Sequence, residues 1–156
     1  MEKLVISNDI LFPQVEELLS KGKKVIIPVK GLSMLPLIVG ERDLVELEAA
    51  PGYAPGDIVL FRLGGRWILH RLLRFDDRGN AIIRGDGVRS GCEVCPPEKI
   101  LGKAVSILRK GRRRFNPYTG PRMFQFRVWE MLRPFRRYIL FLYRHLPWMR
   151  KYFRSL

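Results

Sequence analysis

Short apolar runs separated by turn residues fill the centre of this chain and constrain its fold most strongly. Residues 58–63 and 66–75 have the composition of strands, and the pair Gly64-Gly65 between them is a good two-residue hairpin signal. Further strands are expected over 23–30, 43–48, 81–84 and 100–108. Because these strands are short and turn residues separate them, the sequence predicts a mainly β fold, in the form of a coiled sheet or small barrel.

A short helix is expected before the first strand. Ser7 or Asn8 can cap it, and Gly22 ends it. Its apolar residues recur at helical spacing: Leu11, Val15, Leu18 and Leu19. The strand that follows contains Pro28, which cannot donate a ladder hydrogen bond, so this strand is expected at a sheet edge.

The positive charge of the chain is concentrated in its last third. The 156 residues carry a formal net charge of +14. Residues 1–108 hold 15 Lys and Arg against 14 Asp and Glu, whereas residues 109–156 hold 14 basic residues against Glu130 alone. The chain therefore divides by charge into a nearly neutral body, 1–108, and a basic, aromatic-rich tail, 109–156.

The tail has the pattern of an amphipathic helix. Residues 116–121 interrupt the chain, and from Arg122 on arginines alternate with Phe, Trp, Tyr, Leu and Met. At about 100° per residue, most of these basic residues fall within an arc of roughly 140°. Pro134 and Pro147 are expected to kink or break the helix.

An anionic membrane surface is the favoured partner of residues 122–156. The arginines would face the headgroups while apolar side chains enter the interface. A protein partner and a solvated tail remain open, and nucleic acid is least favoured.

The sequence lacks the features of a membrane-spanning or secreted chain. No apolar run approaches the roughly 18 residues that a spanning helix needs. Met1 to Leu11 contains Glu2, Lys3 and Asp9 and has no apolar core of a signal peptide. We therefore expect a cytoplasmic protein, or one held at the periphery of the cytoplasmic membrane.

Two cysteines form a C-x-x-C motif at Cys92 and Cys95. A structural zinc site needs four ligands, and the chain has no histidines besides His70 and His145. Two plain thiols in a loop are favoured over a redox disulfide, and a zinc site is least favoured. No metal and no cofactor are expected.

A constrained turn presents a serine after the first strand. Gly31 permits a sharp bend, Ser33 follows it, and Pro36 stiffens the exit by fixing its φ angle. A nucleophile could be presented in this way, although an ordinary loop serine has the same short pattern.

Five short motifs occur in order along residues 23–108. They are Ser33-Met34-Leu35-Pro36, Gly56-Asp57-Ile58-Val59-Leu60-Phe61, His70-Arg71, Gly85-Asp86 and Gly102-Lys103-Ala104-Val105. In type and order they resemble the S24/S26 serine peptidase superfamily, which includes the type I signal peptidases. The His-Arg pair is similar to the histidine-base variant of archaea and the endoplasmic reticulum, not to the lysine-base variant. The resemblance implies the coiled β-sheet or small barrel shared by signal peptidases and self-cleaving repressors. The chain departs from typical signal peptidases, which carry an N-terminal membrane anchor.

The resemblance implies a catalytic set of Ser33, His70 and Asp86. Ser33 would be the nucleophile and His70 the general base that takes its proton. Asp86 would hold the imidazole. His70 could instead be a core histidine, and Asp86 a turn former between two glycines. Asp57 is expected to be structural, and Arg71 should point away from His70, either solvated or paired with an acid.

Gly31, Met34 and Leu35 are the candidates for oxyanion and substrate binding. Signal peptidases have a serine at the position of Gly31, so the backbone N–H of Ser33 is the expected oxyanion donor. Met34 and Leu35 would line an apolar substrate groove, or else pack in the core beneath the turn. The resemblance further implies an extended peptide bound by strand addition, with small residues near the cut.

The favoured function is a serine endopeptidase that removes a leader or signal segment from a peptide or preprotein. The alternative is a catalytically silent, peptidase-like body whose basic tail binds a membrane surface or nucleic acid. The presence of Ser33, His70 and Asp86 together favours the first function.

Overall fold

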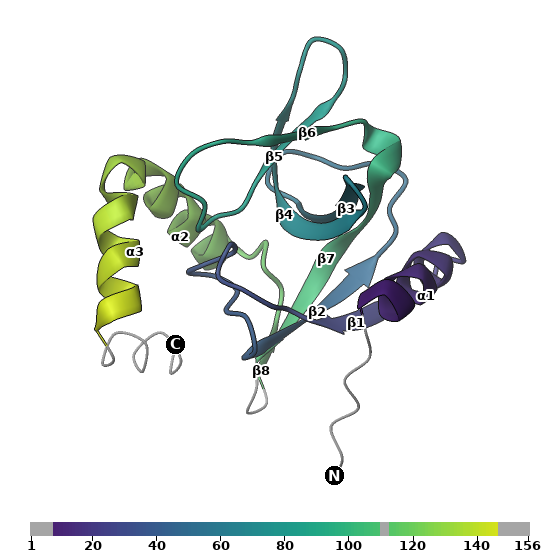
Figure 1. Ribbon diagram of the computed structural model, residues 1–156, viewed down its shortest axis with the longest axis horizontal. Helices are drawn as coiled ribbons and strands as arrows, with labels where there is room; N and C mark the ends of the chain where they lie inside the picture. The colour runs from purple at the N-terminus through teal and green to yellow at the C-terminus, as the bar shows by residue number, and fades with distance from the viewer. Residues whose placement is uncertain (1–7, 110–112, 147–156) are drawn as a thin grey trace.

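The computed structural model describes residues 8–109 and 113–146, which form a sheet with one helix before it and two after it (Figure 1). The strands are β1 (Val25–Pro28), β2 (Asp43–Glu48), β3 (Ile58–Leu63), β4 (Arg66–Phe75), β5 (Ala81–Arg84), β6 (Glu93–Cys95), β7 (Ile100–Arg109) and β8 (Arg113–Phe115). The helices are α1 (Asn8–Ser20), α2 (Gly120–Met131) and α3 (Arg136–His145), with 3-10 turns η1 (Pro97–Lys99) and η2 (Arg133–Phe135). The expected cap at Ser7 and break at Pro147 lie outside the described residues.

The sheet curls into an open half-barrel. Its strand order is β1-β2-β7-β3-β4-β5-β6, with β8 paired to β7. Every pairing among the described strands is antiparallel. Because β7 pairs with both β2 and β3, it joins the N-terminal strands to the rest of the sheet. The mainly β, coiled sheet predicted from the sequence is confirmed by this arrangement.

The β3–β4 hairpin turns at Gly64 and Gly65, as predicted. Their φ angles are 55° and 74°, and the commonest two-residue hairpin turn requires positive φ at both central positions. Consecutive side chains of β4 alternate between the two faces of the strand. His70 and Arg71 therefore point to opposite sides, as expected.

Two apolar clusters hold the sheet. In the first, Val15 and Leu19 of α1 pack with buried residues of β1, β2 and β7, so α1 is a structural helix. In the second, Phe61, Leu72 and Ile83 are buried between β3, β4 and β5. β1 lies at the end of the strand order, which agrees with the edge position predicted from Pro28.

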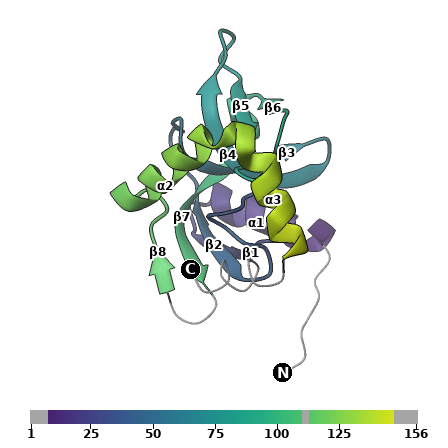
Figure 2. The ribbon, with the colours of Figure 1, turned by 90° about the vertical axis from the view of Figure 1, so that its left-hand side faces the viewer.

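The C-terminal helices pack on the sheet instead of extending away from it. Trp129 of α2 and Leu140 and Tyr143 of α3 are buried with Leu35 and Val39. Figure 2 shows α2 and α3 lying across one side of the curled sheet. The boundary at residue 108 therefore follows the charge distribution but not the packing.

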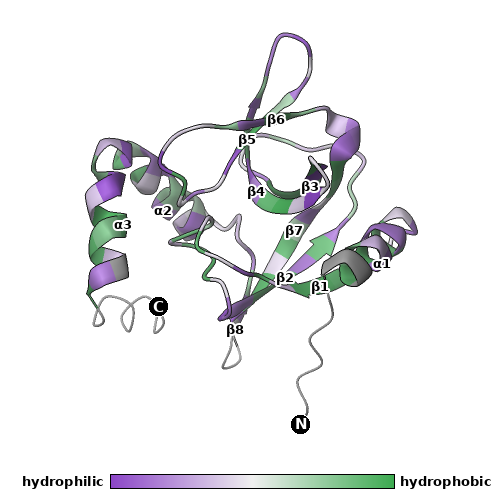
Figure 3. Ribbon diagram, viewed as in Figure 1, coloured by the Kyte–Doolittle hydropathy of each residue, from purple (hydrophilic) through white to green (hydrophobic). Residues whose placement is uncertain are grey.

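Over residues 113–146 the tail forms β8 and two α-helices, and the arginines of these residues do not form the continuous outward stripe that we expected. The break predicted at Pro134 is present as η2. Arg136 is buried, whereas Phe124 and Phe135 are exposed, and Figure 3 shows hydrophobic and hydrophilic residues interleaved along these helices. Within the described ranges, no helix has the length and apolar character needed to cross a membrane.

Glu130 on α2 joins two buried arginines. Its carboxylate accepts hydrogen bonds from Arg84 on β5 and from Arg136 on α3, each over 2.7 Å. Burial alone would raise the pKa of Glu130, but the hydrogen bond from Arg136 and the charges of Arg84 and Arg136 lower it below its ordinary value. The ionised carboxylate therefore holds α2 and α3 onto β5.

Glu130→Ala is expected to lower the free energy of unfolding by about 3–5 kcal/mol, because it leaves two buried guanidinium groups without their carboxylate. Urea unfolding followed by circular dichroism measures this loss. A carboxyl with a lowered pKa stabilises the fold above that pKa, so in the native chain this contribution should fade as the pH falls through the lowered value.

Glu17→Ala is the matched control, since it removes an exposed ion pair between Glu17 on α1 and Lys21 just after the helix. It should change the free energy of unfolding by less than about 1 kcal/mol. Equal losses in the two variants would contradict a structural role for the Glu130 contacts.

Candidate active site

Residues 31–40, which we call the serine turn, connect β1 to β2 and close on themselves. The Gly40 N–H donates to the carbonyl oxygen of Gly31 over 3.1 Å. Gly31 has a φ of 80°, and a Cβ on Gly40 would collide with the backbone of Gly31. The two glycines therefore let the turn close with Ser33 held between them.

Met34 and Leu35 hold the serine turn onto the body. They are only 2% and 3% exposed. Met34 packs in the cluster below β1 and β2, and Leu35 packs against Trp129. The structure favours the core-packing alternative for both residues over the apolar groove, because Met34 is buried in the core of the sheet and the C-terminal helices cover Leu35.

Residues 85–87, which we call the glycine turn, pack directly against the serine turn. The Gly87 N–H donates to the carbonyl oxygen of Ser33 over 2.7 Å. A Cβ on Gly85 would lie 2.8 Å from Nε2 of His70, and closer still to that same carbonyl oxygen. A Cβ on Gly87 would lie 2.5 Å from another carbonyl oxygen of the serine turn. Space therefore requires both glycines, and the backbone carbonyl of Ser33 and Nε2 of His70 both lie against Gly85. No hydrogen bond joins the Ser33 hydroxyl to His70 among the described residues.

His70 lies buried on β4, with its Nδ1 3.2 Å from Oε2 of Glu93 on β6. A carboxylate accepts hydrogen bonds, so Nδ1 carries the proton in this contact and Nε2 keeps its lone pair. Nε2 is the atom that approaches Gly85 and the serine turn. In its neutral form, an imidazole held by this contact has its lone pair on the side of the serine turn.

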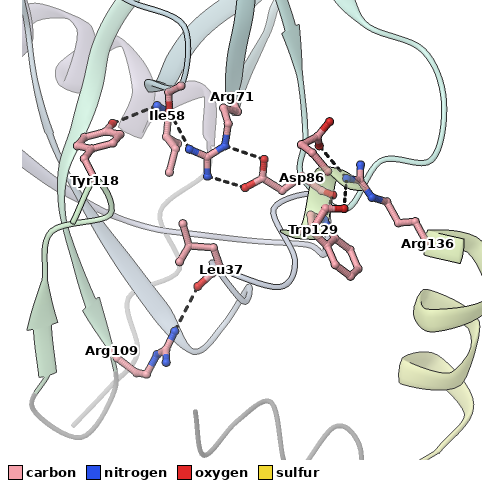
Figure 4. Close-up of polar contacts among 10 residues, drawn as sticks. Leu37, Ile58, Arg71, Asp86, Arg109, Tyr118, Trp129 and Arg136 are labelled. Carbon is pink, nitrogen blue, oxygen red and sulfur yellow. Dashed lines mark hydrogen bonds and ion pairs between the residues drawn. The ribbon is translucent and has the colours of Figure 1, made fainter. Parts of the chain in front are cut away.

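Asp86 binds Arg71 and not His70. Nε and Nη2 of Arg71 donate to the two carboxylate oxygens over 2.8 and 2.7 Å, and both side chains are buried (Figure 4). The planar fork of a guanidinium matches a carboxylate in this two-bond geometry. The expectation that Asp86 orients the imidazole is therefore corrected, and Glu93 occupies that position.

The Arg71–Asp86 pair also ties three parts of the chain together. Nη1 of Arg71 donates to the carbonyl oxygen of Gly56 over 2.7 Å, and the guanidinium lies 4.1 Å from the ring centroid of Phe126 on α2. The indole N–H of Trp129 donates to the carbonyl oxygen of Asp86 over 2.5 Å (Figure 4). The conformation of the glycine turn is thus fixed from β4 and from α2.

Ser33 has two groups available to a bound molecule. Neither its hydroxyl nor its backbone N–H donates a hydrogen bond to the described part of the chain. The residue lines a pocket of about 730 Å³, which Leu32 and Val88 share. The hydroxyl and the backbone N–H of Ser33 are therefore both free to contact a molecule in this pocket.

Glu93 is the site residue that sequence reasoning missed. No motif marks it, and it comes beside His70 only because β5 pairs Ile83 with Glu93 and also pairs with β4. Asp57, in contrast, has the structural role predicted for it, since its carboxylate accepts the Ala54 N–H over 3.0 Å.

The C-x-x-C motif provides two free thiols. Cys92 is exposed, and Cys95 is buried in β6, where burial raises its pKa to about 11. Cys95 is therefore protonated at neutral pH and poorly reactive. No cluster of three or more metal-ligating side chains occurs in the portion that the structure describes.

Searches against known protein families and against curated protein sequences found no match to this chain. The case for the site therefore rests on the order of its motifs and on its geometry.

Glu93→Ala is expected to slow the phosphonylation of Ser33 by a fluorophosphonate about 10- to 100-fold, because His70 loses the group that fixes its tautomer. The rate is measured by intact-protein mass spectrometry. Glu98→Ala, which removes an exposed carboxylate on η1, is the control and should react at the native rate.

Asp86→Asn should act differently, by lowering the free energy of unfolding by about 3–5 kcal/mol, since it leaves Arg71 buried without a carboxylate. A stable Asp86→Asn protein together with a fully reactive Glu93→Ala protein would contradict these two assignments.

Proposed function

We propose that this chain is a serine endopeptidase with Ser33 as nucleophile and His70 as general base. The observation that carries the proposal is the close packing of Gly85 against both residues, with the lone pair of Nε2 on the side of the serine turn. The ordered motifs and the curled antiparallel sheet support a signal-peptidase-like fold.

The geometry supports acyl transfer in two steps. Oγ of Ser33 attacks the peptide carbonyl carbon and passes its proton to Nε2 of His70, and the backbone N–H of Ser33 stabilises the oxyanion. The imidazolium is stabilised by the Glu93 carboxylate at Nδ1 and gives its proton to the leaving amine. Water then hydrolyses the acyl-enzyme by the same route in reverse.

The free edge of β1 supports strand addition as the mode of substrate binding. β1 leads directly into the serine turn, and among the described strands it pairs with β2 alone. An extended peptide paired to β1 would pass beside Ser33. This mode of binding suits a leader or signal segment, which is unfolded before it is cut.

Ser33→Ala is expected to abolish cleavage of a leader-bearing precursor without changing the circular dichroism spectrum. His70→Ala should reduce cleavage by about 10²- to 10⁴-fold. Ser20→Ala, on the exposed face of α1, is the control and should retain native activity. Undiminished cleavage by Ser33→Ala would rule out this serine as the nucleophile.

We further infer that α2 and η2 rest on an anionic membrane surface. Phe124, Met131 and Phe135 are more than half exposed, and Arg127 and Arg133 are exposed near them in the sequence. Aromatic side chains that enter the interface together with arginines at the headgroups are typical of peripheral binding.

The double variant Phe124→Ser and Phe135→Ser should bind anionic vesicles about tenfold more weakly than the native chain, because two apolar side chains no longer enter the interface. Co-sedimentation measures the difference. Phe75→Ser changes an exposed phenylalanine on β4 and should bind as the native chain does. Absence of binding by the native chain would remove this inference.

A further inference from the structure

The pocket beside Ser33 has two opposite walls that come from distant parts of the chain. One wall consists of residues 32–33 and 87–90, and the other of side chains of α3. The pocket measures about 730 Å³, far more than a single small side chain fills. The preference for small residues near the cut, which the resemblance implies, therefore does not follow from this shape.

The α3 wall is held firmly in place. Arg136, at the first turn of α3, donates to the carbonyl oxygens of Trp129 and Val88 over 3.0 and 3.4 Å. Leu140 and Tyr143 are buried beneath the helix. Because Arg136 bonds to the Val88 backbone, α3 is anchored to the opposite wall of the same pocket.

The lining is apolar with a positive rim. Its apolar side chains are Leu32, Val88, Tyr138, Leu140 and Phe141. Arg89 and Arg137 also line it, both exposed, and neither is ion-paired with an acidic residue of the described chain. None of the lining residues is acidic.

We propose that this pocket selects the substrate, by taking a bulky apolar side chain and an adjacent acidic side chain next to the scissile bond. The inference rests on the proposed peptidase function and names its substrate class. The apolar side chain packs against Leu32 and Phe141 and removes apolar surface from water. The acidic side chain lies at the rim, where Arg89 and Arg137 supply specificity more than affinity.

Peptide binding to the Ser33→Ala protein tests the pocket without the need for turnover. The probes are two fluorescein-labelled heptapeptides in a Gly/Ser background, one with adjacent Leu and Asp and the other with Ala and Lys. Fluorescence anisotropy should show about tenfold tighter binding of the Leu-Asp peptide. Equal affinities would overturn the proposal.

Variants in the α3 wall separate the apolar and charged contributions. Phe141→Ala should weaken binding of the Leu-Asp peptide, whereas Leu142→Ala, on the same helix but outside the pocket, should not. Arg137→Glu should shift the preference toward a peptide with adjacent Leu and Lys. Arg78→Glu makes the same charge change in the β4–β5 turn, away from the pocket, and should leave the preference unchanged. The proposal would also be overturned if Leu142→Ala weakened binding as Phe141→Ala does and Arg78→Glu shifted the preference as Arg137→Glu does.

Cleavage of a peptide mixture by the native chain distinguishes a failure of the proposed pocket selectivity from a failure of the proposed peptidase function. Ser33-dependent cuts beside bulky apolar and acidic residues support both. Ser33-dependent cuts without this preference would overturn the pocket and leave the peptidase. Selective binding without any cleavage would leave the pocket as a peptide site and overturn the peptidase.

Discussion

The buried pair of Arg71 and Asp86 is the interaction on which the candidate site depends. Arg71 holds the glycine turn through the carboxylate of Asp86, and the indole of Trp129 holds it through the carbonyl oxygen of Asp86. The glycine turn in turn carries the hydrogen bond to the Ser33 carbonyl and the close contact with His70. A buried ion pair of this kind adds little stability over an apolar pair of the same size, but it fixes one geometry, because every alternative leaves a charge unpaired.

The C-terminal helices also hold the candidate site in place. Glu130 neutralises part of the charge of Arg84 and Arg136, and the apolar side chains of α2 and α3 cover the serine turn from outside. The basic segment therefore stabilises the fold, independently of any partner that it binds. Among its described exposed arginines, Arg137 lines the pocket, and Arg127 and Arg133 lie at the proposed membrane face.

Local sequence patterns predicted six of the eight described strands, the Gly64-Gly65 hairpin, the edge position of Pro28 and the break at Pro134, because each depends on backbone geometry within a few residues. Strands β6 and β8 were not predicted, and β6 is the strand that carries Glu93. The motif order also selected Ser33 and His70, and the fold places the backbone carbonyl of the first and Nε2 of the second beside Gly85. The partner of the imidazole could not be predicted in this way. Asp86 and Glu93 are both acids near strand β5. Only the three-dimensional register shows that Arg71 pairs with Asp86 and His70 with Glu93.

The most direct test of the account is a crystal structure of the chain after phosphonylation by a fluorophosphonate. The account predicts the adduct on Oγ of Ser33, with Nε2 of His70 within about 3.2 Å of it. It also predicts that Glu93 remains on Nδ1 and Asp86 on Arg71. An adduct on another residue, or an imidazole turned away from Ser33 with Asp86 at its Nδ1, would contradict the account.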